Sequence, residues 1–129
     1  MVKALVVEDE EDIRNLLVEQ LLDKGCQVRK ADNGAIALQR VKEEIPDIIF
    51  VDIVMPVMDG ILFVSELRKN LDTAAIPVVL VSALNLPGLK SRARMLGVNH
   101  LLAKPWDQAA LVRMLKINNE WDKSGRAHF

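Results

Sequence analysis

The stretch Ile48-Ile49-Phe50-Val51-Asp52, which continues as Ile53-Val54-Met55-Pro56-Val57-Met58-Asp59-Gly60, decides the fold. It begins with an apolar run too short for a buried helix, and the Pro/Asp/Gly turn signal that follows predicts a strand covered on both faces. Asp52 then lies at the carboxyl end of a central parallel strand. Ligands bind at that edge of open α/β sheets, so Asp52 is a candidate site residue, with a turn or helix-cap role as the alternative.

The chain on both sides of this strand alternates between short apolar runs and segments with helical spacing. Strands are predicted over residues 3–7, 26–31, 48–51, 78–81 and 98–103. Helices are predicted over residues 12–24, 34–45, 87–96 and 107–117, with a further helix between Gly60 and Ile76. This alternation predicts a doubly wound five-stranded parallel sheet of the α/β class, (βα)₅ and flavodoxin-like, with strand order 2-1-3-4-5.

Apolar spacing supports these helices. Ile36, Ala37, Val41 and Ile45 lie on one side of the second helix, and Leu111, Met114 and Leu115 are expected to point inward from the last. The third helix is suggested by the spacing of Leu62, Phe63, Leu67 and Leu71. Asn33 is expected to cap the second helix, and Gly25 and Gly97 are expected at helix ends.

Length and composition describe one domain of ordinary character. We place this domain at residues 1–119 of the 129, with residues 120–129 as a C-terminal tail or linker. A net charge of −1 argues against direct nucleic-acid binding, and no apolar run approaches the ~20 residues that span a membrane. Because no signal-peptide pattern is present, a cytoplasmic location is predicted. Cys26, the single cysteine, is predicted to be structural.

Polar side chains follow four of the predicted strands. The first strand is followed by Glu8-Asp9-Glu10-Glu11, the third by Asp52, the fourth by Ser82 and the fifth by Lys104-Pro105. Carboxylates at neighbouring strand ends repel one another unless a cation intervenes, and Mg²⁺ prefers such oxygen ligands. The sequence therefore predicts a Mg²⁺ site whose ligands are Asp9, Asp52, the carbonyl of Val54 and, through water, Glu8. Glu10 and Glu11 are instead expected at the start of the next helix.

Asp52 has a second predicted role, as a nucleophile. A carboxylate can attack a phosphoryl group to form an aspartyl phosphate when the phosphoryl oxygens are neutralised. The metal would neutralise one oxygen, Lys104 a second, and the hydroxyl and neighbouring amides at Ser82 a third. A lone lysine after a strand is usually a surface residue and a lone serine usually a cap, so it is their convergence at one edge that favours phosphoryl chemistry.

Four motifs resemble, in order, those of the receiver domain of two-component response regulators, chemotaxis-regulator-like, over residues 3–118: VVED, VDIVMPVMDG, VVLVSA and LLAKP. The resemblance implies that Asp52 is the phospho-acceptor, Ser82 the switch hydroxyl and Lys104 the phosphate-binding amine, with the Mg²⁺ ligands as above. It also implies a cis peptide bond before Pro105. The loop that positions the acceptor would be formed by Met55, Pro56, Asp59 and Gly60.

By the same resemblance the chain is a phosphorylation-activated signalling switch rather than an enzyme, although it would support its own phosphorylation and dephosphorylation. Its partner would be a sensor histidine kinase or a phosphotransfer protein. The added charge would draw Ser82 and Lys104 toward Asp52 and reshape the output face made by the fourth helix, fifth strand and fifth helix. A homodimer through that face, and an effector domain beyond the C-terminus, stay open.

Three positions near the output face need separate interpretation. The residue three before Lys104, often Tyr or Phe in the family, is Leu101, which argues against a rotamer-coupled aromatic switch and favours output through the loop and the fourth helix. His100 is expected to be a partly exposed surface residue rather than a phosphorelay histidine. Trp106 is either packed beside a helix capped by Asp107 or an exposed aromatic contact on the output face.

Three other functions share this fold or this chemistry. A flavodoxin-type cofactor binder would need a hydroxyl- and glycine-rich phosphate loop where the chain has acidic residues 8–11. An aspartate-based phosphohydrolase usually carries a second acid two residues after the nucleophile, where the chain has Val54. A receiver domain that is never phosphorylated and serves as a scaffold stays open, because a fold alone does not fix function.

Overall fold

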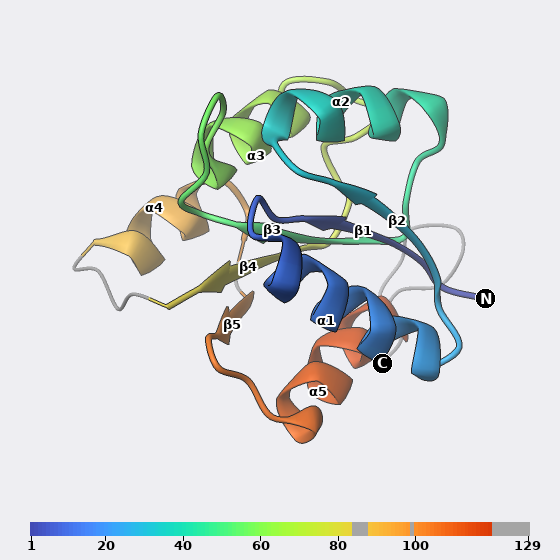
Figure 1. Cartoon of the computed structure of the whole chain (residues 1–129). Coiled ribbons are helices and arrows are strands. Elements are labelled where there is room, and N and C mark those ends of the chain that lie inside the picture. The colour runs from blue at the N-terminus through green and yellow to red at the C-terminus, as the bar shows by residue number, and fades with distance from the viewer. Residues whose placement is uncertain (84–87, 99, 120–129) are drawn as a thin grey trace.

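The computed structural model describes residues 1–83, 88–98 and 100–119, in which strands and helices alternate as predicted (Figure 1). The elements are β1 (Lys3–Val7), α1 (Glu11–Asp23), β2 (Gln27–Ala31), α2 (Gly34–Glu43), β3 (Ile48–Asp52), α3 (Gly60–Arg68), β4 (Val78–Ser82), α4 (Leu89–Met95), β5 (His100–Ala103) and α5 (Gln108–Asn119). The predicted tail, residues 120–129, and Pro87 lie outside the described residues, so the domain boundary stays a prediction.

The strands form one parallel sheet in the order β2-β1-β3-β4-β5, which confirms the predicted topology. β1 pairs directly with β3, although α1, β2 and α2 separate the two strands in the sequence. Asp52 at the end of β3 lies opposite Val81, and Ser82 at the end of β4 lies opposite Ala103. Because all strands run in one direction, the residues that end or follow them gather at one edge of the sheet.

Helices cover both faces of the sheet, with α2 and α3 on one side and α1 and α5 on the other (Figure 1). Each face has its own apolar cluster. Alternate residues of β3 enter the two clusters, Ile49 and Val51 the first and Ile48 and Phe50 the second, and all four are fully buried at 0 % exposure. The prediction that this strand is covered on both faces is therefore confirmed.

Two of the four residues whose spacing suggests the third helix lie off the buried face of α3. Leu62 and Leu71 are exposed, and the buried residues of the helix are Gly60, Phe63, Val64 and Leu67. The helix ends at Arg68, before Leu71, which is 95 % exposed. It ends there because the turn that follows supplies the hydrogen-bond donors to carbonyls of its last turn. In that turn the hydroxyl of Thr73 donates to the carbonyl of Leu67 at 2.6 Å.

Three further element ends differ from the prediction. The spacing predicts Ile45 on the apolar face of α2, but the helix ends at Glu43 and Ile45 is 50 % exposed. The cause is Pro46, since a residue before proline avoids helical backbone. β5 begins at His100 rather than at residue 98, and Cys26 is buried just before β2 rather than within it.

Side chains cap three helices where the sequence predicts turns or caps. The carbonyl or carboxylate oxygens of Asn33, Asp59 and Asp107 accept hydrogen bonds from backbone N–H groups in the first turns of α2, α3 and α5, at 2.9, 2.8 and 2.7 Å. Gly25 and Gly97 have positive φ, 87° and 75°, at the ends of α1 and α4. Within the residues described, no helix combines the length and the apolar character needed to cross a membrane.

Candidate functional site

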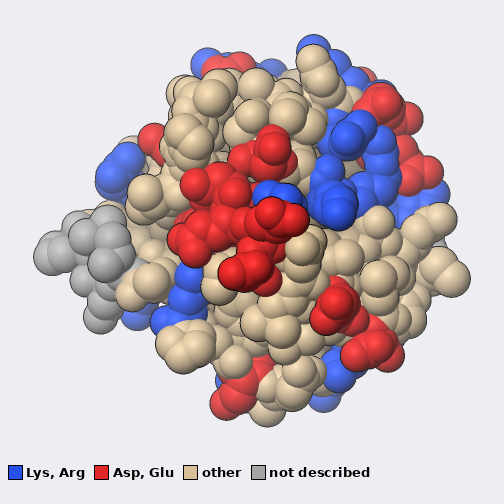
Figure 2. Space-filling model, viewed as in Figure 1, with Lys and Arg blue, Asp and Glu red and all other residues tan. Residues whose placement is uncertain are grey.

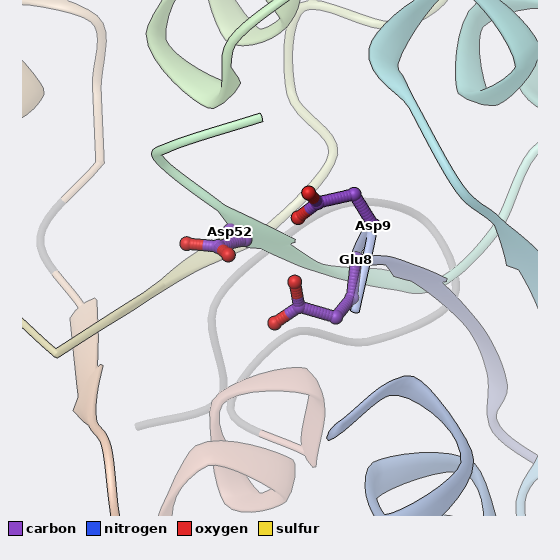
Figure 3. Close-up of side chains that lie close together, drawn as sticks. All are labelled: Glu8, Asp9 and Asp52. Atoms are coloured by element: carbon purple, nitrogen blue, oxygen red, sulfur yellow. The ribbon is translucent and has the colours of Figure 1, made fainter. Parts of the chain in front are cut away.

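Polar residues from four strand ends lie at the carboxyl edge of the sheet. Glu8 and Asp9 follow β1, Asp52 ends β3, Ser82 ends β4 and Lys104 follows β5. Figure 3 shows the carboxylates of Glu8, Asp9 and Asp52 gathered around the end of β3. The structure therefore brings together the residues that the sequence singles out.

The amine of Lys104 lies between two of these carboxylates. Its Nζ donates to Oε1 of Glu8 at 2.6 Å and to Oδ2 of Asp52 at 3.0 Å. Only 14 % of the lysine side chain and 3 % and 7 % of the two acids are exposed, so these ion pairs are largely shielded from water. The backbone N–H of Lys104 donates to the carbonyl of Ser82 at 2.9 Å and holds the end of β5 against β4.

The charges at this edge shift the protonation of both partners. Burial and the neighbouring Asp52 raise the pKa of Glu8 to about 7, although the hydrogen bond from Lys104 acts in the opposite direction. Burial acts to lower the pKa of Lys104, but its hydrogen bonds to Glu8 and Asp52 outweigh burial, and the pKa is raised. The lysine is therefore charged at neutral pH, and one ammonium faces a cluster of several carboxylates.

The loop after Asp52 folds back so that α3 begins beside the end of β3. The N–H of Gly60 donates to the carbonyl of Ile53 at 2.9 Å, and a Cβ on Gly60 would lie 2.3 Å from the carbonyl oxygen of Asp52. The Oδ1 of Asp52 accepts from the N–H of Val54 at 3.3 Å. Val57 has a φ of 69°, which β-branched residues rarely adopt, so the loop that fixes Asp52 carries backbone strain.

The acidic cluster suits a divalent cation that prefers oxygen ligands. One carboxylate oxygen from each of Glu8, Asp9 and Asp52 lies within 4.8 Å of the others. Acidic side chains also gather on the molecular surface above this edge, as Figure 2 shows. Asp9 is more exposed than the other two acids, so this side of the cluster faces solvent. The donor set therefore fits Mg²⁺, which binds a few carboxylates and keeps part of its water shell.

Arg14 is a site residue that the sequence analysis does not single out. Its Nη1 donates to the carbonyls of Glu8 and Asp9 at 3.0 and 3.5 Å, so the guanidinium holds the backbone that carries both acids. Acidic residues are usually preferred near the start of a helix, and basic residues are not. The basic Arg14 in this region of α1 is therefore the one sequence feature that could have pointed to a special role. Glu10 and Glu11 are exposed at the start of α1, where the sequence places them.

Other residues named from the sequence surround the cluster. Pro105 follows Lys104 through a cis peptide bond, as the family resemblance implies. Leu101 is partly buried and packs against the apolar cluster on the α2 and α3 side of the sheet. Pro56 is exposed, and its carbonyl accepts from the N–H of Met58 at 2.8 Å.

Trp106 adopts the packed arrangement of the two that the sequence leaves open. The ring packs against the apolar cluster on the α1 and α5 side, and Nε1 donates to Oε1 of Gln20 on α1 at 2.7 Å. Asp107 caps α5, as described above. A part for Trp106 in the output surface stays a prediction.

Comparison with known proteins identifies the family. The family model of the response regulator receiver domain matches residues 4–116. The chain belongs to the response regulator receiver domain family. This receiver domain is similar to Protein PilH of Pseudomonas aeruginosa, with 32 % identity over 115 residues that cover 89 % of this chain and 95 % of PilH. The predicted family is therefore confirmed, and with it the chemotaxis type.

Solved structures of other receiver domains share the fold. The chemotaxis protein CheY4 of Vibrio cholerae superposes with a TM-score of 0.86 at 30 % identity, covering 91 % of this chain and 98 % of CheY4. The receiver domain of the sensor histidine kinase PA1611 from Pseudomonas aeruginosa, which has a magnesium ion coordinated in its active-site cleft, superposes with a TM-score of 0.82 at 28 % identity and covers 90 % of this chain and 95 % of that one. Receiver domains act as phosphorylation-dependent switches in two-component systems and are not conventional enzymes.

Proposed function

We propose that this receiver domain accepts a phosphoryl group on Asp52 in the presence of Mg²⁺ and changes its output surface in response. The observation that carries the proposal is the Lys104 amine held between Glu8 and Asp52 at the end of β3. Phosphoryl transfer depends on positioning and on neutralising the phosphoryl oxygens, and a buried ammonium beside the acceptor carboxylate supplies both.

The phosphoryl donor is proposed to be a phosphohistidine of a sensor histidine kinase or a phosphotransfer protein. An oxygen of Asp52 forms the new bond to phosphorus while the bond from phosphorus to the histidine nitrogen breaks. The imidazole leaves with that electron pair and takes a proton from solvent. Meanwhile the Lys104 ammonium and the Ser82 hydroxyl each donate to a phosphoryl oxygen, which offsets the charge on the transferred group.

Mg²⁺ is the proposed cofactor because the acidic cluster offers the oxygen ligands that it prefers. Asp9 and Asp52 would hold it through their carboxylates, Val54 through its carbonyl and Glu8 through water. When bound, Mg²⁺ supplies positive charge next to the phosphoryl oxygens. Arg14 supports the same function by holding the backbone of Glu8 and Asp9. The domain would also support loss of the phosphoryl group to water.

The output surface is proposed to be the face made by α4, β5 and α5. An aspartyl phosphate adds strong acceptor oxygens and negative charge, which attract the hydroxyl of Ser82 and the amine of Lys104. Ser82 ends β4, and the chain continues from there to α4, so its movement would reposition that connection. Leu101 has no ring or hydroxyl, which favours the connection and α4 as the parts that change.

This output surface is proposed to bind a partner protein, a second copy of the chain or an effector domain beyond the C-terminus. Leu101 and Trp106 are the residues proposed to contribute to it. The proposed location is the cytoplasm, where sensor kinases present their phosphohistidines, and no direct nucleic-acid contact is proposed because the net charge is −1.

Intact-mass measurement with acetyl phosphate, a small acyl phosphate donor, tests the proposal. We expect a gain of one phosphoryl group with Mg²⁺ and none with EDTA. Asp52→Asn should abolish the gain, whereas Asp23→Asn, the same change at an exposed acid at the end of α1, should retain it. No gain with any donor would contradict the proposal and favour a scaffold that is never phosphorylated.

A further inference from the structure

The connection between β5 and α5 carries Lys104 and is held at both of its ends. The N–H of Lys104 donates to the carbonyl of Ser82 at 2.9 Å, and Asp107 caps α5 at the other end. Between these two points, Trp106 reaches across to α1, where its Nε1 donates to Oε1 of Gln20 at 2.7 Å. This hydrogen bond joins segments that are far apart in the sequence.

Gln20 is held in place by the packing of its helix. It lies on α1, which is fixed to the sheet by Leu17 and Leu21, whose exposure is 2 % and 0 %. The ring of Trp106 packs against the same apolar cluster. Because Trp106 and Gln20 are both partly buried, the hydrogen bond is partly shielded from water, which strengthens it.

The same contact joins the two segments that carry Glu8 and Lys104. Glu8 comes just before α1, and Lys104 comes just before Trp106, and their side chains meet at 2.6 Å. Lysine has a flexible four-carbon stem, so the position of its amine depends on how firmly its backbone is held. We propose that Trp106, through its hydrogen bond to Gln20, is a positioning residue that keeps the Lys104 amine between Glu8 and Asp52.

This inference rests on the proposed function, because it gives Trp106 a part in the phosphoryl transfer that Lys104 supports. A displacement of about 1 Å in a reacting group can cost as much as 10²-fold in rate. Loss of one of several contacts that hold the connection should displace the amine only in part, so we expect phosphorylation of Asp52 to slow by roughly three- to tenfold.

The test uses changes that remove the hydrogen bond and leave an apolar side chain at each position. Trp106→Phe removes the donor, Gln20→Met removes the acceptor, and Gln39→Met is a matched control at an exposed position of α2. The first measurement is the rate constant for phosphorylation by acetyl phosphate with Mg²⁺, followed by intact mass. The second is the ¹⁵N signal of Lys104 Nζ, assigned by its absence from Lys104→Met, which reports where the amine lies.

We expect Trp106→Phe and Gln20→Met to slow phosphorylation by the same factor, and the double variant to be no slower than either, because all three lose one shared hydrogen bond. Both single variants should shift the Lys104 signal toward those of exposed lysines, and Gln39→Met should change neither measurement.

An unchanged rate in either single variant would overturn the inference, as would a slower rate with an unshifted Lys104 signal, because Trp106 would then act by another route. If the unaltered chain took up no phosphoryl group, the proposed function would fail, and the Lys104 signal alone would still decide whether Trp106 positions the amine.

Discussion

Lys104 is the residue that contacts two of the acidic side chains at the proposed acceptor site. Its ammonium pairs with Glu8 and Asp52, and all three side chains are largely shielded from water. Burial of a charge is costly unless a partner is close, so removal of the ammonium leaves two buried carboxylates unpaired. Burial and the neighbouring Asp52 raise the pKa of Glu8 to about 7, so the charged form of this acid depends on the ammonium beside it. In the proposed phosphorylated state, the same ammonium would donate to a phosphoryl oxygen on Asp52.

Lys104→Met should lower the free energy of unfolding by about 1–3 kcal/mol at pH 8, because two buried carboxylates lose their ammonium partner and Glu8 must either stay charged beside Asp52 or take up a proton. Urea denaturation in EDTA measures this change. Mg²⁺ should restore part of the loss by neutralising the same acids. Lys69→Met is the control, because its exposed pair with Glu66 is worth less than about 1 kcal/mol. Equal stability of the two variants would contradict the assigned role of Lys104.

Gly60 lies where the structure leaves no space for a side chain. Gly60→Ala would place a Cβ 2.3 Å from the carbonyl oxygen of Asp52, so the end of β3 or the start of α3 must move. We expect a loss of about 2–3 kcal/mol in unfolding free energy and slower phosphorylation of Asp52. Gly25→Ala meets no atom within 4 Å and should cost only the roughly 1 kcal/mol of its left-handed backbone, with phosphorylation unchanged. Similar phosphorylation rates in both variants would argue against the close approach.

At the scale of elements, Arg68 joins α3 to the segment before β4 and to the end of α4. Its Nε donates to the carbonyl of Leu96 at 2.8 Å, and its Nη1 donates to the carbonyl of Ile76 at 3.0 Å. Burial lowers the pKa of this guanidinium, and its Nη1 also donates to the carbonyl of Thr73 at 3.5 Å. The C-terminal end of α4 is therefore tied to α3 by a hydrogen bond.

Arg68→Met should lower the unfolding free energy by about 2–3 kcal/mol, because the partly buried carbonyls lose charged donors. Hydrogen exchange in α4 should become faster than in α1, where packing is unchanged. Arg92→Met, an exposed change on α4 itself, should have an effect below about 0.5 kcal/mol. Faster exchange spread evenly over all helices would show that Arg68 stabilises the fold in general rather than the attachment of α4.

The chain as a whole gains stability from whatever binds only the folded state. The proposed Mg²⁺ ligands follow β1 and end β3, so unfolding separates them. A Mg²⁺ concentration 100 times the dissociation constant should therefore add about 2.7 kcal/mol to the free energy of unfolding. Thermal unfolding over a range of Mg²⁺ concentrations measures this effect. Asp9→Asn should weaken it strongly, and Asp23→Asn, an exposed acid at the end of α1, should not. A shift that is identical in both variants would place the ion elsewhere.

Topology could be predicted from the sequence because the pattern that determines it is local. The buried run of β3 demands helices on both faces, and parallel strands bring Asp9, Asp52, Ser82 and Lys104 to one edge whatever the details of packing. Helix ends were less predictable. The end of α3 depends on the hydroxyl of Thr73, a contact that hydrophobic spacing does not encode.

Contacts between elements were the part that the sequence could not reveal. Arg14 bonds to carbonyls before its own helix, and Gln20 meets a tryptophan that follows β5. Both contacts depend on the direction that a long side chain takes once helix and sheet have packed, and no spacing rule gives that direction. Strand ends can therefore be assigned to the site from sequence, and the residues that hold them in place require the structure.

The most direct test of the central claim is to locate the phosphoryl group on the chain. Borohydride reduces an aspartyl phosphate to homoserine with release of phosphate, and peptide mass spectrometry then gives the position of the homoserine. After treatment with acetyl phosphate and Mg²⁺, we expect homoserine at position 52 alone. Homoserine at Asp9 or any other acid, or at none, would contradict phosphorylation of Asp52.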